Sequence, residues 1–345
     1  MNMSRPTPDL GMIVAFVFVV LAIAFSGKVA TVRTPSLITS TTTPVVETAG
    51  VAQQNSTTTS AQHATSTNVS SPLDISAAKL RAALVNIICY APTNSSVRSI
   101  TGSGVIIDPK GIILTNAHIA QYFLLTKRNV FCTIRAGSPA VDKYKASPVY
   151  ISPAWLKANA DLLTQTNPIG TGEHDFAFLV VTSSATTAKL PVSFPYIPLA
   201  TGSPIIGTSV AIASYGAQTL GVSQIQSALF PTIAFGSVQD VFTFASTTID
   251  VLALGGSVAA QKGSSGGGIV GKEGKLLGTL TTSMIGGDTN TRVLHAITTS
   301  YIRNEYTNET GQTLDTLLAK SPTTAVVDFA PQIPALEAIL TAHLP

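Results

Sequence analysis

From about residue 72 onward, short apolar runs alternate with turn residues along the chain. The runs are bounded by residues such as Gly, Pro, Asn and Asp, and they cover residues 85–90, 104–107, 111–114, 130–134, 176–181, 204–213, 232–241, 247–254, 268–270, 275–280 and 292–297. Many short strands without long helices between them are typical of antiparallel barrels or sandwiches, not of alternating β/α units. The pattern therefore predicts an all-β protein.

Two segments of this region have a helical pattern instead. Residues 76–84 predict a short helix that begins near Ser76, and residues 333–344 carry apolar side chains at helical spacing. We expect the second segment to form a C-terminal helix that packs on the body of the protein.

The first 74 residues have a different character. Residues 10–26 contain an apolar run that is short for a spanning helix and long for the apolar core of a signal peptide. We interpret it as a membrane-spanning signal anchor, with a cleaved signal peptide as the alternative. Residues 27–74 are rich in Ser and Thr and predict a flexible stalk, because they bury too little apolar surface to fold. Both readings predict an extracytoplasmic domain, anchored to the membrane or secreted.

Composition and charge narrow the classes of function. Only 11% of the residues are charged and the net charge is +3, without a basic stripe, so nothing indicates nucleic-acid binding. The two cysteines, Cys89 and Cys132, match no metal-binding spacing. The sequence predicts no metal site and no cofactor.

A loop of small residues carries the candidate chemistry. Residues 263–268 read GSSGGG and lead into an apolar strand, and we interpret Ser265 as a nucleophile on this loop. A serine hydroxyl needs a base to take its proton, and the base is usually a histidine held by a carboxylate. Among the five histidines, His118 directly follows a short strand, where its side chain can face a cleft, and His174 immediately precedes Asp175.

At these residues the sequence resembles a known family. Residues 102–119 (GSGVIIDPKGIILTNAHI), residues 174–180 (HDFAFLV) and residues 263–267 (GSSGG) resemble the three active-site motifs of trypsin-like serine peptidases of the Deg/HtrA type, in the same order. Each motif alone is weak, whereas three in order are specific. The resemblance implies that His118 is the general base, that Asp175 orients it and that Ser265 is the nucleophile. It also implies an oxyanion hole made by the backbone N–H groups of Gly263 and Ser265.

The resemblance implies a fold as well. We expect two antiparallel six-stranded β-barrels of the chymotrypsin type with the active site between them, and no PDZ domain after the second. The expected organisation is a short tail at residues 1–9, the signal segment at 10–26, the stalk at 27–74, a first barrel with His and Asp at 75–190, a second barrel with Ser at 191–305 and a helical tail at 306–345. Two positions depart from the family pattern, namely Ser264 and Gly268.

The implied substrates are polypeptides. In the resembling family, the pocket for the residue before the scissile bond is lined by segments that correspond here to residues 257–261 and 278–282. Neither segment carries an acidic residue, so we expect a small or apolar side chain there, with Ala259, Ala260, Thr279 and Thr281 as tentative pocket residues. The resemblance also leaves a homo-oligomer open.

In the resembling fold, Cys89 and Cys132 lie on neighbouring strands of the first barrel. A disulfide between them suits an exported domain, and two buried thiols are the alternative.

Two other functions compete with the peptidase. Gly263-x-Ser265-x-Gly267 also fits the nucleophile elbow of α/β-hydrolases, which would leave Asp288 and His295 as partners and would require parallel strands and helices. The third candidate is a peptidase-like module that binds peptides at the cell surface without cleaving them.

Overall fold

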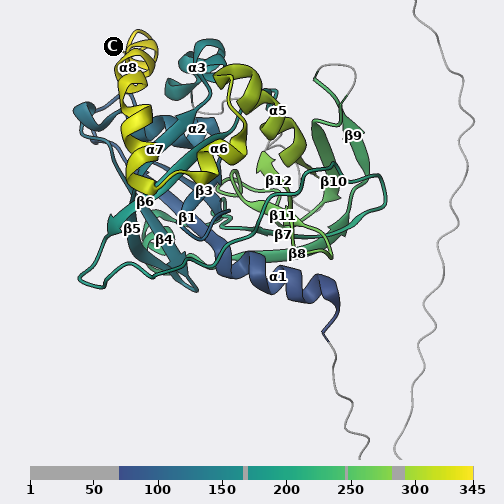
Figure 1. Cartoon of the computed structure of the whole chain (residues 1–345). Coiled ribbons are helices and arrows are strands. Elements are labelled where there is room, and N and C mark those ends of the chain that lie inside the picture. Colours follow the sequence, from purple (N-terminus) through teal and green to yellow (C-terminus); the bar gives the residue numbers. More distant parts are fainter. Residues whose placement is uncertain (1–69, 166–169, 245–247, 282–291, 345) are drawn as a thin grey trace, which may run out of the picture. The chain divides into compact units, whose positions relative to one another are not determined.

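The computed structural model describes residues 70–165, 170–244, 248–281 and 292–344 (Figure 1). The described residues all lie within one compact unit, Ser66–Pro345. The expected signal segment at residues 10–26 and most of the expected stalk fall outside the described residues. Within the described ranges, no helix is both long and apolar enough to cross a membrane.

The first six strands form a closed antiparallel barrel. They are β1 (Leu84–Tyr90), β2 (Ile100–Ile106), β3 (Ile112–Thr115), β4 (Phe131–Gly137), β5 (Ala140–Ile151) and β6 (Ala177–Ser184), in the order β1-β2-β3-β6-β5-β4. Pairing of β1 with β4 closes the barrel, and its interior is filled by aliphatic and aromatic side chains. This part of the fold is as the sequence predicts.

A disulfide ties the closing strand pair of this barrel. Cys89 of β1 lies directly opposite Cys132 of β4, and the two sulfur atoms are bonded. The alternative of two free thiols is therefore wrong.

The second half of the fold is an open sheet of seven strands, not the expected six-stranded barrel. Its strands are β7 (Ser209–Ser214), β8 (Thr232–Ser237), β9 (Asp240–Phe242), β10 (Val251–Gly256), β11 (Gly268–Val270), β12 (Leu276–Thr281) and β13 (Val293–Thr298), in the order β8-β7-β11-β12-β13-β10-β9. The apolar run at residues 232–241 divides into β8, which pairs with β7, and β9, which pairs with β10. Because the two pieces occupy opposite edges and do not pair with each other, the sheet stays open.

Helix α1 (Pro72–Ala83) precedes the barrel and packs on β7 and β11 of the second sheet. It begins earlier than the expected Ser76. Ser71 is its N-cap and forms a capping box with Asp74, and Pro72 occupies the first turn, where its missing N–H costs nothing. The buried Leu80 lies on the face of α1 that meets the sheet.

The remaining helices lie between strands or follow the last strand, β13. They are α2 (Ala117–Ala120), α3 (Pro153–Asn159), α4 (Val222–Ser227), α5 (Thr299–Thr310), α6 (Leu314–Ala319), α7 (Pro322–Phe329) and α8 (Ile333–Thr341), with 3-10 turns η1 (Gln121–Leu124), η2 (Thr126–Arg128), η3 (Ala160–Thr164) and η4 (Ala330–Gln332). The C-terminal part thus contains several helices where one was expected. Helix α7 packs on β5 and β6, and α8 packs on α3. The C-terminal helices therefore cover one side of the barrel (Figure 1).

Candidate active site

The loop before β11 makes a sharp turn that only glycine can complete. Gly263 and Gly266 have φ angles of 93° and 84°, in the left-handed region that side chains disfavour. A Cβ at Gly266 would also lie 2.0 Å from the Ser103 carbonyl oxygen. The composition of this loop is therefore a steric requirement of its path.

Ser103 on β2 ties this loop to the first barrel. Its hydroxyl donates to the Gly263 carbonyl at 2.8 Å, and its N–H donates to the Ser265 carbonyl at 2.8 Å. The same hydroxyl oxygen accepts from the Tyr215 N–H at 2.8 Å. The buried Ser103 thus binds the backbone of Gly263 and Ser265, on either side of Ser264, and the backbone of Tyr215, which directly follows β7.

The two neighbouring serines of the loop have different surroundings. Ser264 is completely buried, and its hydroxyl accepts a hydrogen bond from Ser214 at 3.0 Å. Ser265 lines a cavity that also contains His118 and Asp175. Only the second serine therefore faces a space where a substrate can bind.

His118 and Asp175 form a hydrogen-bonded pair. His118 lies in α2, directly after β3, and its Nδ1 is 2.7 Å from Asp175 Oδ2. The His118 backbone N–H donates to the other carboxylate oxygen at 3.0 Å, and Asn116 donates its side-chain N–H to the Asp175 carbonyl at 2.9 Å. Because the carboxylate accepts, the neutral imidazole carries its proton on Nδ1 and keeps its lone pair on Nε2.

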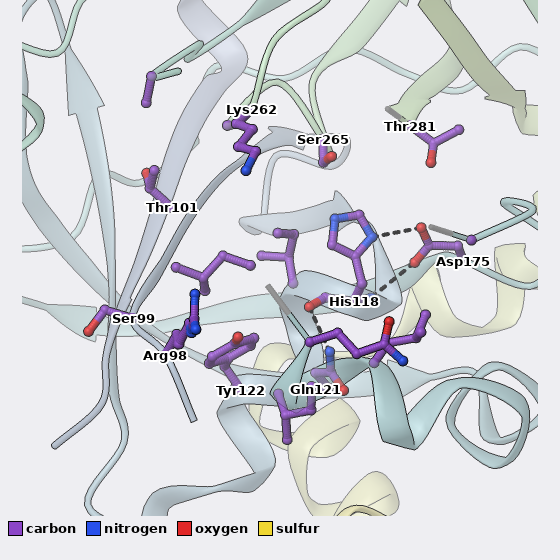
Figure 2. A pocket seen from close by; sticks show the side chains of 18 of the residues that line it. Arg98, Ser99, Thr101, His118, Gln121, Tyr122, Asp175, Lys262, Ser265 and Thr281 are labelled. Carbon is purple, nitrogen blue, oxygen red and sulfur yellow. Dashed lines mark hydrogen bonds and ion pairs between the residues drawn. The ribbon is translucent and has the colours of Figure 1, made fainter. Parts of the chain in front are cut away.

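The His118 ring, with its Nε2 atom, faces the cavity, and Asp175 lies behind it. The Asp175 side chain is 6% exposed and that of His118 is 28% exposed, so the carboxylate is shielded while the ring can be reached. In Figure 2 Ser265 lies beside the imidazole, away from the ring nitrogen that is joined to Asp175. The arrangement brings a hydroxyl, an imidazole and a buried carboxylate to one cavity.

The cavity measures about 390 Å³, and much of its lining is apolar. The apolar lining residues, here called the apolar wall, are Ile100, Ile119, Tyr122, Trp155, Leu162, Leu163, Ala217 and Ile225. The Trp155 ring centroid lies 6.4 Å from that of His118. Burial raises the pKa of Tyr122 to about 12, so its phenol stays neutral and adds no charge to the wall. Among the described residues of the lining, Arg98 and Lys262 are the cations, and Asp175 is the carboxylate.

Comparison with known proteins agrees with this architecture. The trypsin-like peptidase domain family matches residues 102–278, which is just over half of the chain and includes His118, Asp175 and Ser265. The chain belongs to this family. It is therefore a hydrolase of the serine endopeptidase class. The antiparallel pairing of its described sheets also excludes the α/β-hydrolase alternative.

The solved structures that match the chain include two proteases. The active form of the Rv3671c protease from M. tuberculosis is 18% identical over 69% of this chain and 85% of that chain, with a TM-score of 0.43. The serine endoprotease from Yersinia pestis is 21% identical over 71% of this chain and 69% of that chain, with a TM-score of 0.44. No curated protein matches the sequence.

The four expected pocket residues have different surroundings in the structure. Thr281 lines the cavity. Ala259 and Ala260 are buried in the core of the second sheet, and Thr279 donates its hydroxyl to the Gly267 carbonyl at 3.2 Å. Of the four, the structure thus brings only Thr281 to the cavity. Asp288, named for the hydrolase alternative, lies outside the described residues.

Gly268, which departs from the family pattern, has a packing explanation in the peptidase. It lies in β11, paired with Ala213 on one side and Thr279 on the other. A Cβ here would come within 2.7 Å of the Leu276 side chain and 2.8 Å of the Val105 side chain. A side chain at this position would therefore require the Leu276 and Val105 side chains to move.

Some residues that build the site gave no signal in the sequence. Ser103 is part of the first motif, yet nothing in that motif indicates a contact 160 residues away. Trp155 and Ile225 belong to short helices that the apolar pattern does not predict. Only the folded chain brings them to the cavity.

The residue before Asp175 belongs to a different cluster. His174 has a left-handed backbone with a φ of 56°, and its ring contacts Glu305 and Glu309 of α5. These contacts raise the pKa of His174, chiefly through Glu309, against the opposing effect of burial. Burial alone would raise the pKa of Glu309, but its contacts with His174 and Ser152 hold it below the usual value.

Proposed function

We propose that the peptidase cleaves polypeptides through a Ser265–His118–Asp175 triad and an acyl-enzyme. The observation that supports this most strongly is the 2.7 Å contact between His118 Nδ1 and a buried Asp175 carboxylate, in the cavity that Ser265 also lines. Such a carboxylate holds the imidazole in the tautomer that can accept a proton and stabilises the imidazolium that forms.

In the proposed reaction, Ser265 Oγ attacks the carbonyl carbon of the scissile bond while its proton passes to His118 Nε2. The tetrahedral intermediate collapses when the imidazolium gives that proton to the leaving amine, which departs and leaves an ester on Ser265. Water then attacks the ester, His118 takes the proton of the water, and return of the proton to Ser265 Oγ releases the acid. Asp175 stays ionised throughout.

The proposed oxyanion hole consists of the backbone N–H groups of Gly263 and Ser265. Its support is the rigidity of the loop, because Ser103 binds the carbonyl groups of both residues. Loss of one such donor typically costs about 2.7–4 kcal/mol of transition-state stabilisation.

We propose substrates with a small or apolar residue before the scissile bond. In the described lining of the cavity, the carboxylate is that of Asp175, which is occupied by His118, so the walls offer no counter-ion for Lys or Arg. The apolar wall around Trp155 suits uncharged side chains.

We also propose that the enzyme works outside the cytoplasm, in protein quality control or processing. The support is the apolar run at residues 10–26 and the disulfide, since disulfides persist in oxidising compartments. If the apolar run is retained as an anchor, the enzyme stays in the membrane after carbonate extraction, whereas a cleaved signal peptide releases it into the soluble exported fraction.

Labelling with a fluorophosphonate probe tests the proposed chemistry. We expect the wild-type protein to label at neutral pH and the adduct to map to Ser265. Ser265→Ala should abolish labelling, while Ser264→Ala is the matched control and should still label. A folded wild-type protein that does not label would instead favour the non-catalytic peptide-binding module.

A further inference from the structure

Three side chains with metal-binding donors converge beside the active site, on the far side of Asp175. His174 Nδ1 lies 3.1 Å from Glu309 Oε1 and 3.4 Å from Glu305 Oε2. One donor atom from each of the three side chains lies within 4.8 Å of the others. Glu305 and Glu309 are four residues apart on α5, so both project from the same face of the helix.

The backbone of His174 directs its ring into this cluster. A left-handed residue reverses the local chain direction, and histidine is among the residues that tolerate this conformation. As a result, the His174 ring faces α5 while the next side chain, Asp175, faces His118. The His174 N–H donates to the Tyr301 hydroxyl at 3.2 Å, which attaches the same turn to α5.

The two glutamates are each oriented by a further hydrogen bond. Ser152 Oγ donates to Glu309, at 2.8 and 3.0 Å from its two oxygens, and Asn308 donates to Glu305 Oε1 at 2.9 Å. The remaining ring nitrogen of His174 lies 3.8 Å from a Glu173 carboxylate oxygen. Histidine ligands of metals usually have a carboxylate or carbonyl at the second nitrogen, which sets the tautomer.

We propose that His174, Glu305 and Glu309 bind a zinc ion. One imidazole and two carboxylates with a fourth position left for water form a donor set that zinc accepts. Metal–ligand bonds of about 2.0–2.2 Å in a tetrahedron put neighbouring donors about 3.4 Å apart. The two measured separations from His174 Nδ1 are close to that value. The side chains are 26%, 19% and 12% exposed, so an ion and its water can reach them.

The bound ion would connect the segment that carries Asp175 to α5. His174 and Asp175 share a peptide bond, and α5 follows β13 of the second sheet. Zinc would therefore stabilise the fold next to the triad and would take no part in the hydrolysis. This site is independent of the proposed catalytic roles, and its failure would leave them unaffected.

Calorimetric titration of the tag-free, full-length protein with zinc chloride tests the site. We expect saturable binding of one ion per chain in the protein that has been stripped with a chelator. Glu305→Gln and Glu309→Gln should each weaken binding by about tenfold or more. Asp315→Asn is the matched control, because it removes an exposed carboxylate of the neighbouring helix α6 that pairs with Arg303. Circular dichroism confirms that each variant is folded.

The Glu305→Gln variant and a cobalt spectrum distinguish loss of a metal ligand from loss of the fold. Because Glu309 also binds Ser152, Glu305→Gln decides the question if Glu309→Gln does not fold. Cobalt substitution should give the strong visible absorption of tetrahedral coordination in the wild type and a weakened band in Glu305→Gln. The proposal is overturned if zinc does not bind, if Glu305→Gln binds it as well as the wild type, or if His118→Gln alone removes the binding. In the last case the ion occupies the catalytic pair.

Discussion

The two halves of the peptidase position their parts of the active site in different ways. His118 and Asp175 lie in and beside the closed barrel, and their contacts run between residues of that barrel. The Ser265 loop belongs to the open second sheet, yet the carbonyl groups on both sides of Ser264 are held by Ser103 of the barrel. The proposed base and its carboxylate are thus held within one half, whereas the loop of the proposed nucleophile depends on the contact between the two halves.

The largest expected effect comes from replacing Ser265 or His118 of the proposed triad. Ser265→Ala and His118→Ala should each lower kcat by about 10⁶-fold, and the double variant should lose little more, because the two residues act as a unit. Steady-state kinetics on a quenched peptide substrate measures all three. If the two losses multiplied, the residues would act independently and the shared mechanism would be wrong.

Loss of the disulfide should affect the barrel half more than the sheet half. Cys89 and Cys132 are 43 residues apart, and a crosslink of that length contributes about 3–4 kcal/mol to stability. Replacing both by alanine should lower the melting temperature, which scanning calorimetry measures. Hydrogen exchange should rise more in β1 and β4 than in β7 and β11, and a uniform rise across both halves would contradict the comparison.

Ser103→Ala tests the dependence of the loop on the barrel. It removes one donor to the Gly263 carbonyl and one acceptor for the Tyr215 N–H, and a buried group left without a partner costs about 1–3 kcal/mol. We expect kcat/KM to fall by about tenfold or more while zinc binding is unchanged. Ser183→Ala, an exposed serine of β6, is the control. A Ser103→Ala enzyme with wild-type kinetics would show that the loop holds its shape unaided.

The smallest effect concerns acid stability of the second sheet. Burial lowers the pKa of His295 in the folded protein. At pH values below about 6.5, His295 therefore binds a proton more readily in the unfolded chain than in the folded chain, which favours unfolding. Stability should therefore fall as pH drops through this range, and His295→Gln should show a smaller fall. Melting temperatures between pH 7 and pH 5 measure the difference, with the exposed His343→Gln as the control. Parallel curves for His295→Gln and the wild type would exclude this contribution.

The sequence predicts the barrel better than the rest of the fold, for physical reasons. Apolar runs indicate strands with continuous buried stretches, such as β3 and the first five residues of β6. The longest strand, β5, gives no such run because its first half carries Asp142, Lys143 and Lys145 on an exposed surface. Helix α5 is likewise missed, since it is mostly polar and buries few of its side chains.

The candidate site shows the same division. Its three motifs are local in the sequence and can be found there, and the cavity does contain His118, Asp175 and Ser265. The Ser103 contact and the cluster of His174 with Glu305 and Glu309 join residues that are more than a hundred positions apart. No local pattern indicates such contacts, because they arise from the packing of barrel, sheet and helices.

The most direct test of the catalytic account is a crystal structure of the enzyme inactivated by a peptide phosphonate. We predict a covalent bond between phosphorus and Ser265 Oγ, a phosphonyl oxygen within hydrogen-bond distance of the N–H groups of Gly263 and Ser265, and the His118 ring still joined to Asp175. An adduct on another residue, or a phosphonyl oxygen turned away from both N–H groups, would contradict it.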